Sequence, residues 1–429
     1  MLDIKFIREN LIEVKEMLKK RRVEADLNHL IEIDEKRLEL QQKIEKLRQD
    51  RNLAAKKKEI EWGKKIKGEL EKLEPAFKAV EEEEDSYLEA VPNMLSPEVP
   101  EGEGDGDNKE IKRWGEQPGF DFKPLDHVEL GKQLNLIDFE RGAKVAGNKF
   151  YFLKGDAVLL EFALIDYAMK QLQKEGFVPF RPPDLVKPEI ASGVGFQPRG
   201  PEAQVYTIEK ENLSLIGTAE IPLGGYHAGE ILDEKVLPLK YLGFSPCFRT
   251  EAGSYGRVSY GLYRVHQFDK LEIFIYCNQS ESEKIHEYIL SLEEKLFQGL
   301  ELPYRVVDVC TGDLGAPAYR KFDVEAWMPG RPPATPLPDR FDARRARQGG
   351  WGEVTSTSNT TDYQARRLNI KYRRSDGKVE FVHTLNGTAL AISRTLIAIL
   401  ENYQRKDGSV EVPQVLQAYV GKKVIEPIR

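Results

Sequence analysis

Apolar residues recur at alternating steps of three and four positions along two stretches near the start of the chain. The first run comprises Leu30, Ile33, Leu40, Ile44, Leu47 and Ala54, and the second comprises Ile66, Leu70, Leu73, Phe77, Val80, Tyr87 and Val91. Arg37 and Arg51 interrupt the first run, and Glu84 interrupts the second. Because this spacing is typical of a coiled-coil seam, two helices that fold back on each other near Trp62 and Gly63 are predicted.

The flanks of this predicted hairpin carry further signals. Residues 1–25 have the periodicity of a shorter amphipathic helix. Pro75 lies inside the second run, where it is expected to kink the helix or remove a hydrogen bond. The predicted turn is rich in basic residues, namely Lys56, Lys57, Lys58, Lys64, Lys65 and Lys67. These lysines are interpreted either as a solvated tip or as an arm that follows phosphate groups.

The pattern of the chain changes from long helical repeats to mixed helix and strand signals after residues 95–108. These residues contain Pro, Gly and acidic residues and almost nothing apolar. The domain boundary is placed there, giving domains 1–108 and 109–429. The second domain is predicted to contain helices at 156–175, 280–300 and 391–404, and strands at 176–183, 204–206, 213–215, 271–276, 302–310 and 323–327. Strands without βαβ regularity predict a mainly antiparallel sheet flanked by helices, so the fold class is α+β. Residues 329–352 are expected to form an irregular insertion.

Composition narrows the class of protein. Of the 429 residues, 40% are hydrophobic and 31% are charged, which fits a globular protein with an additional charged helical part. The net charge of -7 gives no overall basic footprint, so any nucleic acid would bind through local patches. The three cysteines are far apart, which disfavours a zinc site or a disulfide framework. The first ten residues are charged too early for the apolar part of a secretory leader, and no apolar run of 18 residues occurs, so a cytoplasmic protein that does not enter a membrane is expected.

The candidate chemistry centres on residues 244–272. Arg249 and Glu251 are two positions apart, so on a strand they would share one face. A glycine-rich loop follows, and it carries Arg257 and Arg264. A guanidinium fork suits phosphate or carboxylate, and a carboxylate suits amine groups, although a surface hairpin with ion pairs would look alike. No P-loop and no GxGxxG motif after a strand is present.

Several segments in one order resemble the bacterial-type seryl-tRNA synthetases, a family of class II aminoacyl-tRNA synthetases. They are GTAE at 217–220, FRTEAGSYGR at 248–257, GLYRVHQFDKLE at 261–272, TSTSNTTDYQARR at 355–367 and TLNGTALAISRTLIAILENYQ at 384–404. The opening hairpin and the segment 421–427 fit the same family. The resemblance implies the class II catalytic fold and covers nearly the whole chain except the insertion.

The resemblance also implies an activity and its site. L-serine would be activated with ATP and Mg²⁺ to seryl-adenylate, and the seryl group would be transferred to the 3′ end of tRNA(Ser). Members of this family commonly charge tRNA(Sec) as well. The enzyme would be a cytoplasmic homodimer. Arg249 and Arg394 would be catalytic. The serine site would comprise Thr218, Ala219, Glu220, Arg249, Glu272 and Thr388. The ATP site would comprise Arg249, Thr250, Glu251, Arg264, Val265, Phe268, Glu353, Val354, Thr355, Ser356 and Arg394, with Glu353 and Ser356 as Mg²⁺ ligands.

Individual roles follow from the same resemblance. Arg249 would clamp the α-phosphate and the serine carboxylate, Glu251 would accept from the adenine amino group and Phe268 would stack on the base. Arg264 and Arg394 would hold the β- and γ-phosphates. His266 is interpreted as a structural residue because the chemistry needs no side-chain base.

The chain departs from the family pattern at residues 258–260, at Thr357 and in the arginine-containing insertion 329–352, which ends directly before Glu353. Two alternatives therefore stay open. One is a ligase that makes seryl-adenylate but loads another acceptor, and this ligase would not need residues 26–94. The other is a non-catalytic RNA-binding relative, which would bind ATP without turnover.

Overall fold

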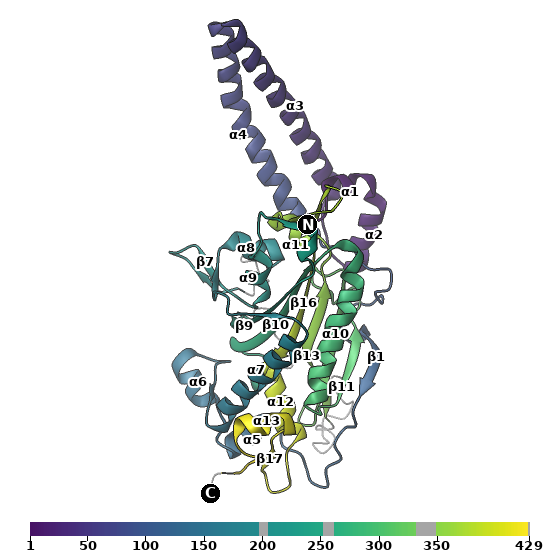
Figure 1. Ribbon diagram of the computed structural model, residues 1–429, viewed down its shortest axis with the longest axis vertical. Coiled ribbons are helices and arrows are strands. Elements are labelled where there is room, and N and C mark those ends of the chain that lie inside the picture. Colours follow the sequence, from purple (N-terminus) through teal and green to yellow (C-terminus); the bar gives the residue numbers. More distant parts are fainter. Residues whose placement is uncertain (197–204, 252–260, 332–348, 428–429) are drawn as a thin grey trace. The chain divides into compact units, whose positions relative to one another are not determined.

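The computed structural model describes residues 1–196, 205–251, 261–331 and 349–427, and these form two compact units, Met1–Leu95 and Ser96–Arg429 (Figure 1). The units divide at Leu95 rather than at the expected residue 108. Residues 96–108 belong with the second unit because their backbone is hydrogen-bonded to it. The amide of Ser96 donates to the carbonyl of Tyr319 at 3.0 Å. The amide of Thr311 donates to the carbonyl of Pro100 at 2.9 Å.

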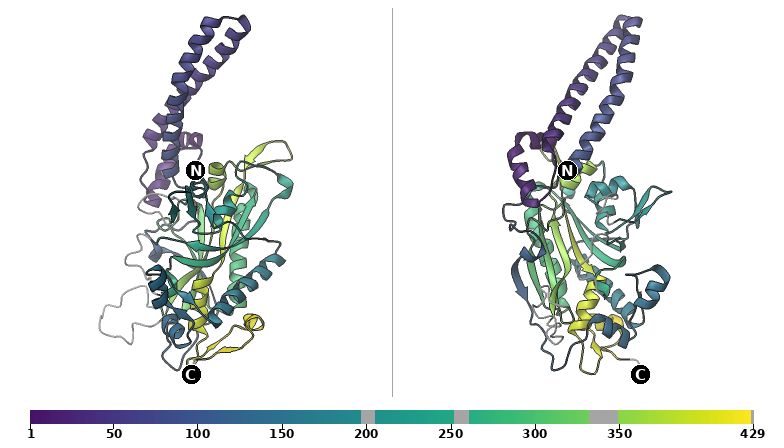
Figure 2. Two further views of the ribbon diagram at one scale, coloured as in Figure 1. Left: turned by 90° about the vertical axis from the view of Figure 1, so that its left-hand side faces the viewer. Right: turned by 180° about the vertical axis from the view of Figure 1, so that it is seen from behind.

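The first unit consists of four helices: α1 (Ile4–Glu9), α2 (Leu11–Arg21), α3 (Leu27–Lys57) and α4 (Ile60–Ala90). The last two run side by side as an antiparallel hairpin in every view, as predicted (Figure 2). The predicted position of the turn is wrong by a few residues. Lys58 adopts the left-handed conformation with φ 59° and ends α3, whereas Trp62 and Gly63 lie inside α4. Pro75 also lies inside α4, where it has no N–H to donate.

Two of the three charged interruptions of the predicted seam, Arg37 and Glu84, are partners of each other. Arg37 on α3 places its Nε 2.5 Å from a carboxylate oxygen of Glu84 on α4. The same guanidinium lies 2.6 Å from Asp34, which is fully buried and also lies 3.0 Å from Arg8. Beyond this cluster the seam is apolar, with Ile44, Ala54, Ile66 and Leu70 buried.

Within the described residues, the second unit is built on an eight-stranded sheet with the strand order β1-β11-β12-β13-β16-β10-β9-β4. Its neighbours are antiparallel except β4 and β9, so the predicted sheet type is confirmed. The strands are β1 (Lys109–Trp114), β4 (Val178–Phe180), β9 (Leu239–Phe248), β10 (Gln267–Cys277), β11 (Tyr304–Asp308), β12 (Arg320–Met328), β13 (Gly350–Asn359) and β16 (His383–Ala391). Gly350 to Gly352, expected within the irregular insertion, are in fact the start of β13.

Helices cover both faces of this sheet, and β10 shows why. Its Leu271, Ile273 and Ile275 point into a core that includes residues of α7 (Asp156–Lys174), α10 (Ser282–Gly299) and α12 (Ile392–Asn402). Its Phe274 and Tyr276 point the other way, into a core shared with α8 (Pro188–Val194), α9 (Glu220–Gly225) and α11 (Tyr363–Leu368). Strand alternation thus separates two apolar layers.

The remaining elements are short. The helices are α5 (His127–Gln133), α6 (Phe139–Ala146) and α13 (Gln414–Val420), with 3₁₀ turns η1 (Asp105–Asp107), η2 (Glu234–Val236), η3 (Gly261–Tyr263) and η4 (Gln279–Glu281). The strands are β2 (Ile137–Asp138), β3 (Phe152–Leu153), β5 (Leu185–Val186), β6 (Thr207–Ile208), β7 (Leu213–Leu215), β8 (Ile231–Asp233), β14 (Lys371–Arg373), β15 (Val379–Phe381), β17 (Val410–Glu411) and β18 (Val424–Ile425). The predicted hairpin at 204–216 is the pair β6 and β7, with its first arm slightly later than expected.

Candidate active site

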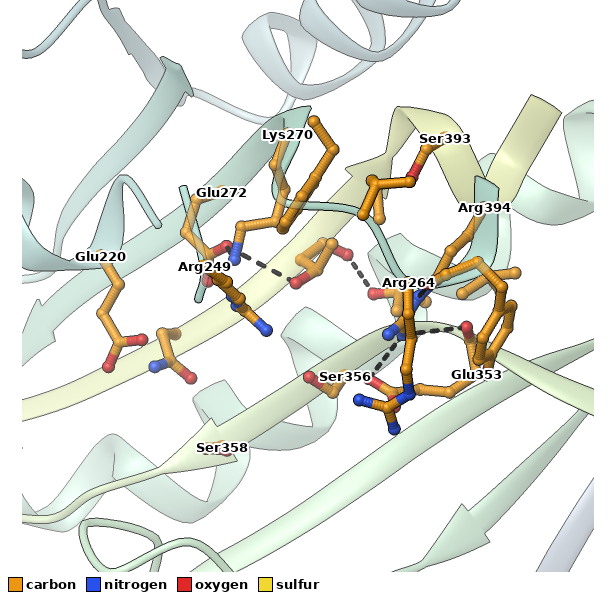
Figure 3. Close-up of a pocket in the computed structure, with 18 of the residues that line it drawn as sticks. Glu220, Arg249, Arg264, Lys270, Glu272, Glu353, Ser356, Ser358, Ser393 and Arg394 are labelled. Atoms are coloured by element: carbon orange, nitrogen blue, oxygen red, sulfur yellow. Dashed lines mark hydrogen bonds and ion pairs between the residues drawn. The ribbon is translucent and has the colours of Figure 1, made fainter. Parts of the chain in front are cut away.

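A cavity of about 340 Å³ opens on the sheet of the second unit (Figure 3). Its walls include most of the residues that the sequence singled out, namely Glu220, Arg249, Glu251, Arg264, Val265, Phe268, Glu272, Glu353, Val354, Thr355, Ser356, Thr388 and Arg394. Thr218, Ala219 and Thr250 are not among the lining residues. Segments more than a hundred residues apart in the chain therefore supply one site.

The central strand β10 lays three functional groups along the cavity. Phe268, Lys270 and Glu272 are spaced by two, so they face the same side of the sheet. Lys270 and Glu272 form a buried ion pair. Lys270 was not predicted as a site residue, although its period-two spacing with Phe268 and Glu272, at the start of the predicted strand 271–276, was a usable signal.

A bulge in β13 brings the two expected Mg²⁺ ligands together. Glu353 and Ser356 are three positions apart, so a regular strand would point them to opposite faces. Val324 pairs with Thr355 and Glu325 pairs with Glu353, which leaves Val354 as the extra residue. Both Glu353 and Ser356 consequently line the cavity (Figure 3).

A second irregularity acts in the same way on β16. Glu272 pairs with Thr388 while Leu271 pairs with Leu390, so Ala389 is the extra residue. The strand then runs directly into α12, whose first turn carries Arg394. The bulge therefore helps to bring Thr388 and the start of α12 to the same cavity.

The prediction that Arg249 and Glu251 share a strand face is wrong. Strand β9 ends at Phe248, and Glu251 has a left-handed backbone with φ 49°. Arg249 instead donates from Nε to the carbonyl of Gly217 at 3.2 Å, and its guanidinium lies 5.4 Å from the centre of the Phe268 ring. Glu251 pairs with Arg264 at 3.1 Å. Both side chains reach the cavity through turn geometry rather than strand alternation.

The other end of the cavity is held by Arg394 and Glu353, whose side chains lie 3.2 Å apart. Arg394 also donates to the carbonyl oxygens of Glu353 at 3.1 Å and Tyr263 at 3.4 Å. Burial by itself would raise the pKa of Glu353, but the positive charges of Arg394, Lys321 and Arg249 outweigh it and hold the pKa at about 2. Glu353 is therefore an ionised carboxylate over the whole physiological range.

Carboxylates gather at the opposite end. Glu272 accepts from the hydroxyl of Thr218 at 3.2 Å and from that of Thr388 at 3.5 Å. Burial, reinforced by the charge of Glu272, raises the pKa of Glu220 to about 7. The side-chain amide of Gln364 donates to Glu220 at 2.8 Å. Thr218 thus supports Glu272 rather than lining the cavity.

The predicted residues outside the lining have packing positions. Ala219 is fully buried in the core around α9, where its Cβ lies against Gly243 on β9. His266, expected to be structural, lies 2.9 Å through Nδ1 from the carbonyl oxygen of Arg249 and equally far from the hydroxyl of Tyr206. The cavity also has lining residues that sequence analysis did not select: Phe196, Tyr263, Lys270, Lys321, Ser358, Asn386, Ala391 and Ser393.

Other expectations concern absent features or undescribed segments. Among residues 1–196, 205–251, 261–331 and 349–427, no cluster of three or more His, Cys, Asp or Glu could hold a metal ion, and the three cysteines are unpaired. No described helix is long and apolar enough to cross a membrane. Arg257, residues 258–260 and most insertion arginines lie outside the described residues.

Comparison with known proteins gives the same family as the site motifs. Residues 1–95 match the seryl-tRNA synthetase N-terminal domain, and residues 206–403 match the tRNA synthetase class II core domain of the G, H, P, S and T enzymes. The structure resembles the crystal structure of seryl-tRNA synthetase from Pyrococcus horikoshii complexed with ATP, with a TM-score of 0.87, 40% identity and 100% of both chains covered. A serine-tRNA ligase from Naegleria fowleri in complex with AMP gives 0.83 at 33% identity, covering 100% of this chain and 99% of the other.

Curated relatives match over their full length. The serine–tRNA ligase of Dictyoglomus turgidum is 54% identical over 440 residues, with 100% of both chains covered. That of Treponema denticola is 52% identical over 432 residues, covering 98% of this chain and 99% of the relative. Two matched family domains and this identity over the whole length show that the chain belongs to the bacterial-type seryl-tRNA synthetases, a family of class II aminoacyl-tRNA synthetases.

Proposed function

We propose that the chain activates L-serine with ATP and transfers the seryl group to tRNA(Ser). The observation that carries the proposal is the order of charged groups along one cavity. Lys270 pairs with Glu272 at one end, and Arg264 and Arg394 pair with Glu251 and Glu353 at the other. Glu220 and Glu272 lie toward one end, Arg264 and Arg394 lie toward the other, and Arg249 lies between them (Figure 3). This distribution matches an amino acid at one end and a triphosphate at the other, with the arginine in the middle in contact with both.

The arginine end suits ATP. Phe268 offers a ring for stacking on adenine, and Glu251 in the same cavity offers an acceptor for the adenine amino group. Arg264 and Arg394 supply guanidinium groups for the β- and γ-phosphates. Because Arg264 and Arg394 pair with Glu251 and Glu353 here, nucleotide binding would exchange these ion pairs for phosphate contacts.

The oxygen donors beside Arg394 fit Mg²⁺. Glu353 is an ionised carboxylate with 38% of its side chain exposed, and the hydroxyl of Ser356 shares its cavity wall. Such hard donors, together with substrate phosphates, are the ligands that Mg²⁺ prefers. A bound ion would neutralise charge that develops on the departing pyrophosphate. The protein's part is to hold the ion through Glu353 and Ser356.

The carboxylate end suits the serine side of the substrate. Glu272 and Glu220 provide negative charge for the ammonium group, and Thr388 with Asn386 provides polar groups near the hydroxyl. Thr218 orients Glu272, and Ala219 packs behind the pocket. A site that hydrogen-bonds the substrate hydroxyl leaves buried groups unpaired when alanine enters, which can discriminate by roughly 10^4-fold.

The chemistry proceeds in two displacements. A serine carboxylate oxygen attacks the α-phosphorus, the bond to the β-phosphate oxygen breaks, and pyrophosphate leaves. A ribose hydroxyl at the 3′ end of tRNA then attacks the seryl carbonyl and gives up its proton, the bond between the acyl carbon and the phosphate oxygen breaks, and AMP leaves with the bonding electrons. Arg249 lies where it can hold both the carboxylate and the α-phosphate, so catalysis rests on positioning and charge stabilisation.

The partners follow from the first unit and the family. The helical hairpin α3–α4, with its basic turn, would bind the long variable arm of tRNA(Ser) and recognise the shape and the backbone of the RNA more than its bases. The enzyme would charge tRNA(Sec) in the same way. A homodimer is supported by β4, the last strand in the sheet order, where Val178 keeps 53% exposure. The cytoplasm is the compartment in which these substrates meet.

Serine-dependent ATP–pyrophosphate exchange tests the proposal. Exchange is expected with serine and at most weakly with threonine, alanine or glycine, and charging of tRNA(Ser) is expected in the same preparation. Exchange without charging of any tRNA would favour a ligase for another acceptor. The absence of exchange with every amino acid would overturn the enzymatic function.

The pH dependence of serine binding gives a second expected result. Glu220 is protonated below its pKa of about 7 and charged above it, so its attraction for the serine ammonium is present above pH 7 and lost below it. The KM for serine should therefore rise about tenfold for each pH unit below 7. Exchange measured from pH 5.5 to 7.5 checks this, with Glu220→Gln as the control that removes the dependence. A KM that stays constant in the unmodified enzyme would contradict the role of Glu220.

A further inference from the structure

A buried histidine and glutamate lie outside the cavity but contact two segments that lead into it. His127 begins α5 and Glu401 lies near the end of α12, 274 positions later, and their exposures are 5% and 1%. The imidazole Nδ1 of His127 lies 2.8 Å from a carboxylate oxygen of Glu401, and the His127 amide donates to the same oxygen at 3.0 Å. His127 lies outside the motifs that predicted the site, and Glu401 lies within the segment 384–404 but was given no role there.

The pair is extended by a hydrogen bond on each side. The amide of Leu262 donates to the imidazole Nε2 of His127 at 3.1 Å. The amide of Gly330 donates to the second carboxylate oxygen of Glu401 at 2.8 Å. Because Nε2 accepts a hydrogen bond from the amide of Leu262, the ring hydrogen must reside on Nδ1 and point to Glu401. The imidazole is thus neutral, has a defined tautomer and connects the amide of Leu262 to the carboxylate of Glu401 through hydrogen bonds.

Both contacting segments approach so closely that only glycine fits. A Cβ on Gly261 would lie 2.0 Å from Nε2 of His127, and the φ of Gly261 is +61°. A Cβ on Gly330 would lie 2.6 Å from the Asp126 backbone and 3.0 Å from the carboxylate carbon of Glu401. Two glycines from distant parts of the chain are therefore packed against one polar pair.

Tyr263 and Arg331, which follow these two glycines in the chain, are in contact with each other. Tyr263 follows Leu262, and its ring lies under the guanidinium of Arg331 at 4.1 Å and under that of Arg394 at 4.6 Å. The carbonyl of Tyr263 also accepts from Arg394. Arg264 comes next in the chain and lines the cavity with Tyr263 and Arg394.

We infer that His127 and Glu401 are positioning residues for the triphosphate end of the cavity. His127 sets the backbone of Leu262, and thereby Tyr263 and Arg264. Glu401 sets Gly330, and thereby Arg331, which holds the Tyr263 ring against Arg394. The inference rests on the proposed function, since it assigns the polyphosphate of ATP to these arginines. Serine binding, at the far end of the cavity, should not depend on the pair.

Variants that remove one hydrogen bond at a time test this inference. His127→Asn keeps a donor toward Glu401 and loses the acceptor for Leu262, whereas His127→Gln can return an acceptor at the position of Nε2. Glu401→Gln leaves one oxygen for His127 and presents an NH₂ group to the amide of Gly330. The dissociation constant of ATP, measured by calorimetry on the full-length chain without serine, reports on the pair independently of turnover.

His127→Asn and Glu401→Gln are expected to weaken ATP binding about tenfold, the effect of one buried hydrogen bond, and to raise the KM for ATP in exchange similarly. The KM for serine should change less than twofold, and His127→Gln should restore most of the ATP affinity. Tyr403→Phe is the matched control, because it removes a 2.7 Å hydrogen bond from the residue that follows α12 to the carbonyl of Leu300, and neither residue lines the cavity. It should lower the melting temperature without weakening ATP binding.

Two outcomes would overturn the inference. One is that His127→Asn and Glu401→Gln lower the melting temperature as Tyr403→Phe does and leave the ATP affinity unchanged. The other is that they raise the KM values of serine and ATP equally, which would indicate general distortion. If the unmodified chain binds ATP but supports no exchange, the proposed function fails while the calorimetric comparison still decides the role of the pair.

Discussion

Replacing Arg249 with alanine is expected to reduce serine-dependent ATP–pyrophosphate exchange by about 10^3-fold. Arg249 is the cation between the carboxylate end and the arginine end of the cavity, and its guanidinium is oriented by Gly217 and Phe268. It would bridge the serine carboxylate and the α-phosphate, the two groups between which the first step of the reaction forms a bond. Its loss should therefore lower kcat as well as raise KM.

Two companion variants sharpen this test. Arg249→Lys keeps the charge but loses the planar fork, so it should recover only a small part of the activity. Arg113→Ala removes an arginine that pairs with Glu110 on the exposed strand β1, and it should leave exchange unchanged. If Arg249→Lys were as active as the unmodified chain, the bidentate clamp would be refuted.

Replacing Arg37 with alanine is expected to destabilise the helical hairpin by about 3–5 kcal/mol, among the largest effects for a single substitution. Asp34 is fully buried and the side chain of Glu84 keeps 8% exposure, so both carboxylates would lose a charged partner inside the seam. Hydrogen–deuterium exchange of peptides from α3 and α4 in the full-length chain measures the free energy of opening of this unit alone.

The same hairpin offers a matched control. Arg48 on α3 pairs with Glu74 on α4 at 2.9 Å, but these side chains are 56% and 48% exposed. Arg48→Ala should cost less than about 1 kcal/mol because water screens that pair. The double variant Arg37→Leu, Glu84→Leu should be more stable than Arg37→Ala, since it leaves no carboxylate of Glu84 unpaired. Equal effects of Arg37→Ala and Arg48→Ala would contradict the importance of the buried cluster.

The sequence by itself determined the elements whose signal is local. The three-four spacing of residues such as Ile44 and Leu70 predicted the hairpin, because a helix returns to the same face at that interval. Alternation along residues 271–276 predicted β10, and the motifs around Arg249 and Arg394 indicated the family. Each of these signals is contained within a few turns of helix or a single strand.

Only the tertiary structure decided which residues meet. The bulge at Val354 turns Glu353 and Ser356 to one side of β13, and a bulge depends on the neighbouring strand as well as on its own residues. The turn after Phe248, and not strand geometry, brings Arg249 to the cavity. The period-two spacing of Lys270 and Glu272 places them on one face of β10, but only the packing around that strand buries their ion pair inside the site.

The polar contacts across long sequence separations were equally beyond local patterns. Arg37 and Glu84 looked like separate interruptions of two seams, yet they neutralise each other once α3 and α4 are paired. No local pattern relates His127 to Glu401, and their contact exists only because α5 and α12 pack together. A buried polar group must find a partner wherever the fold supplies one, and that partner need not be near in sequence.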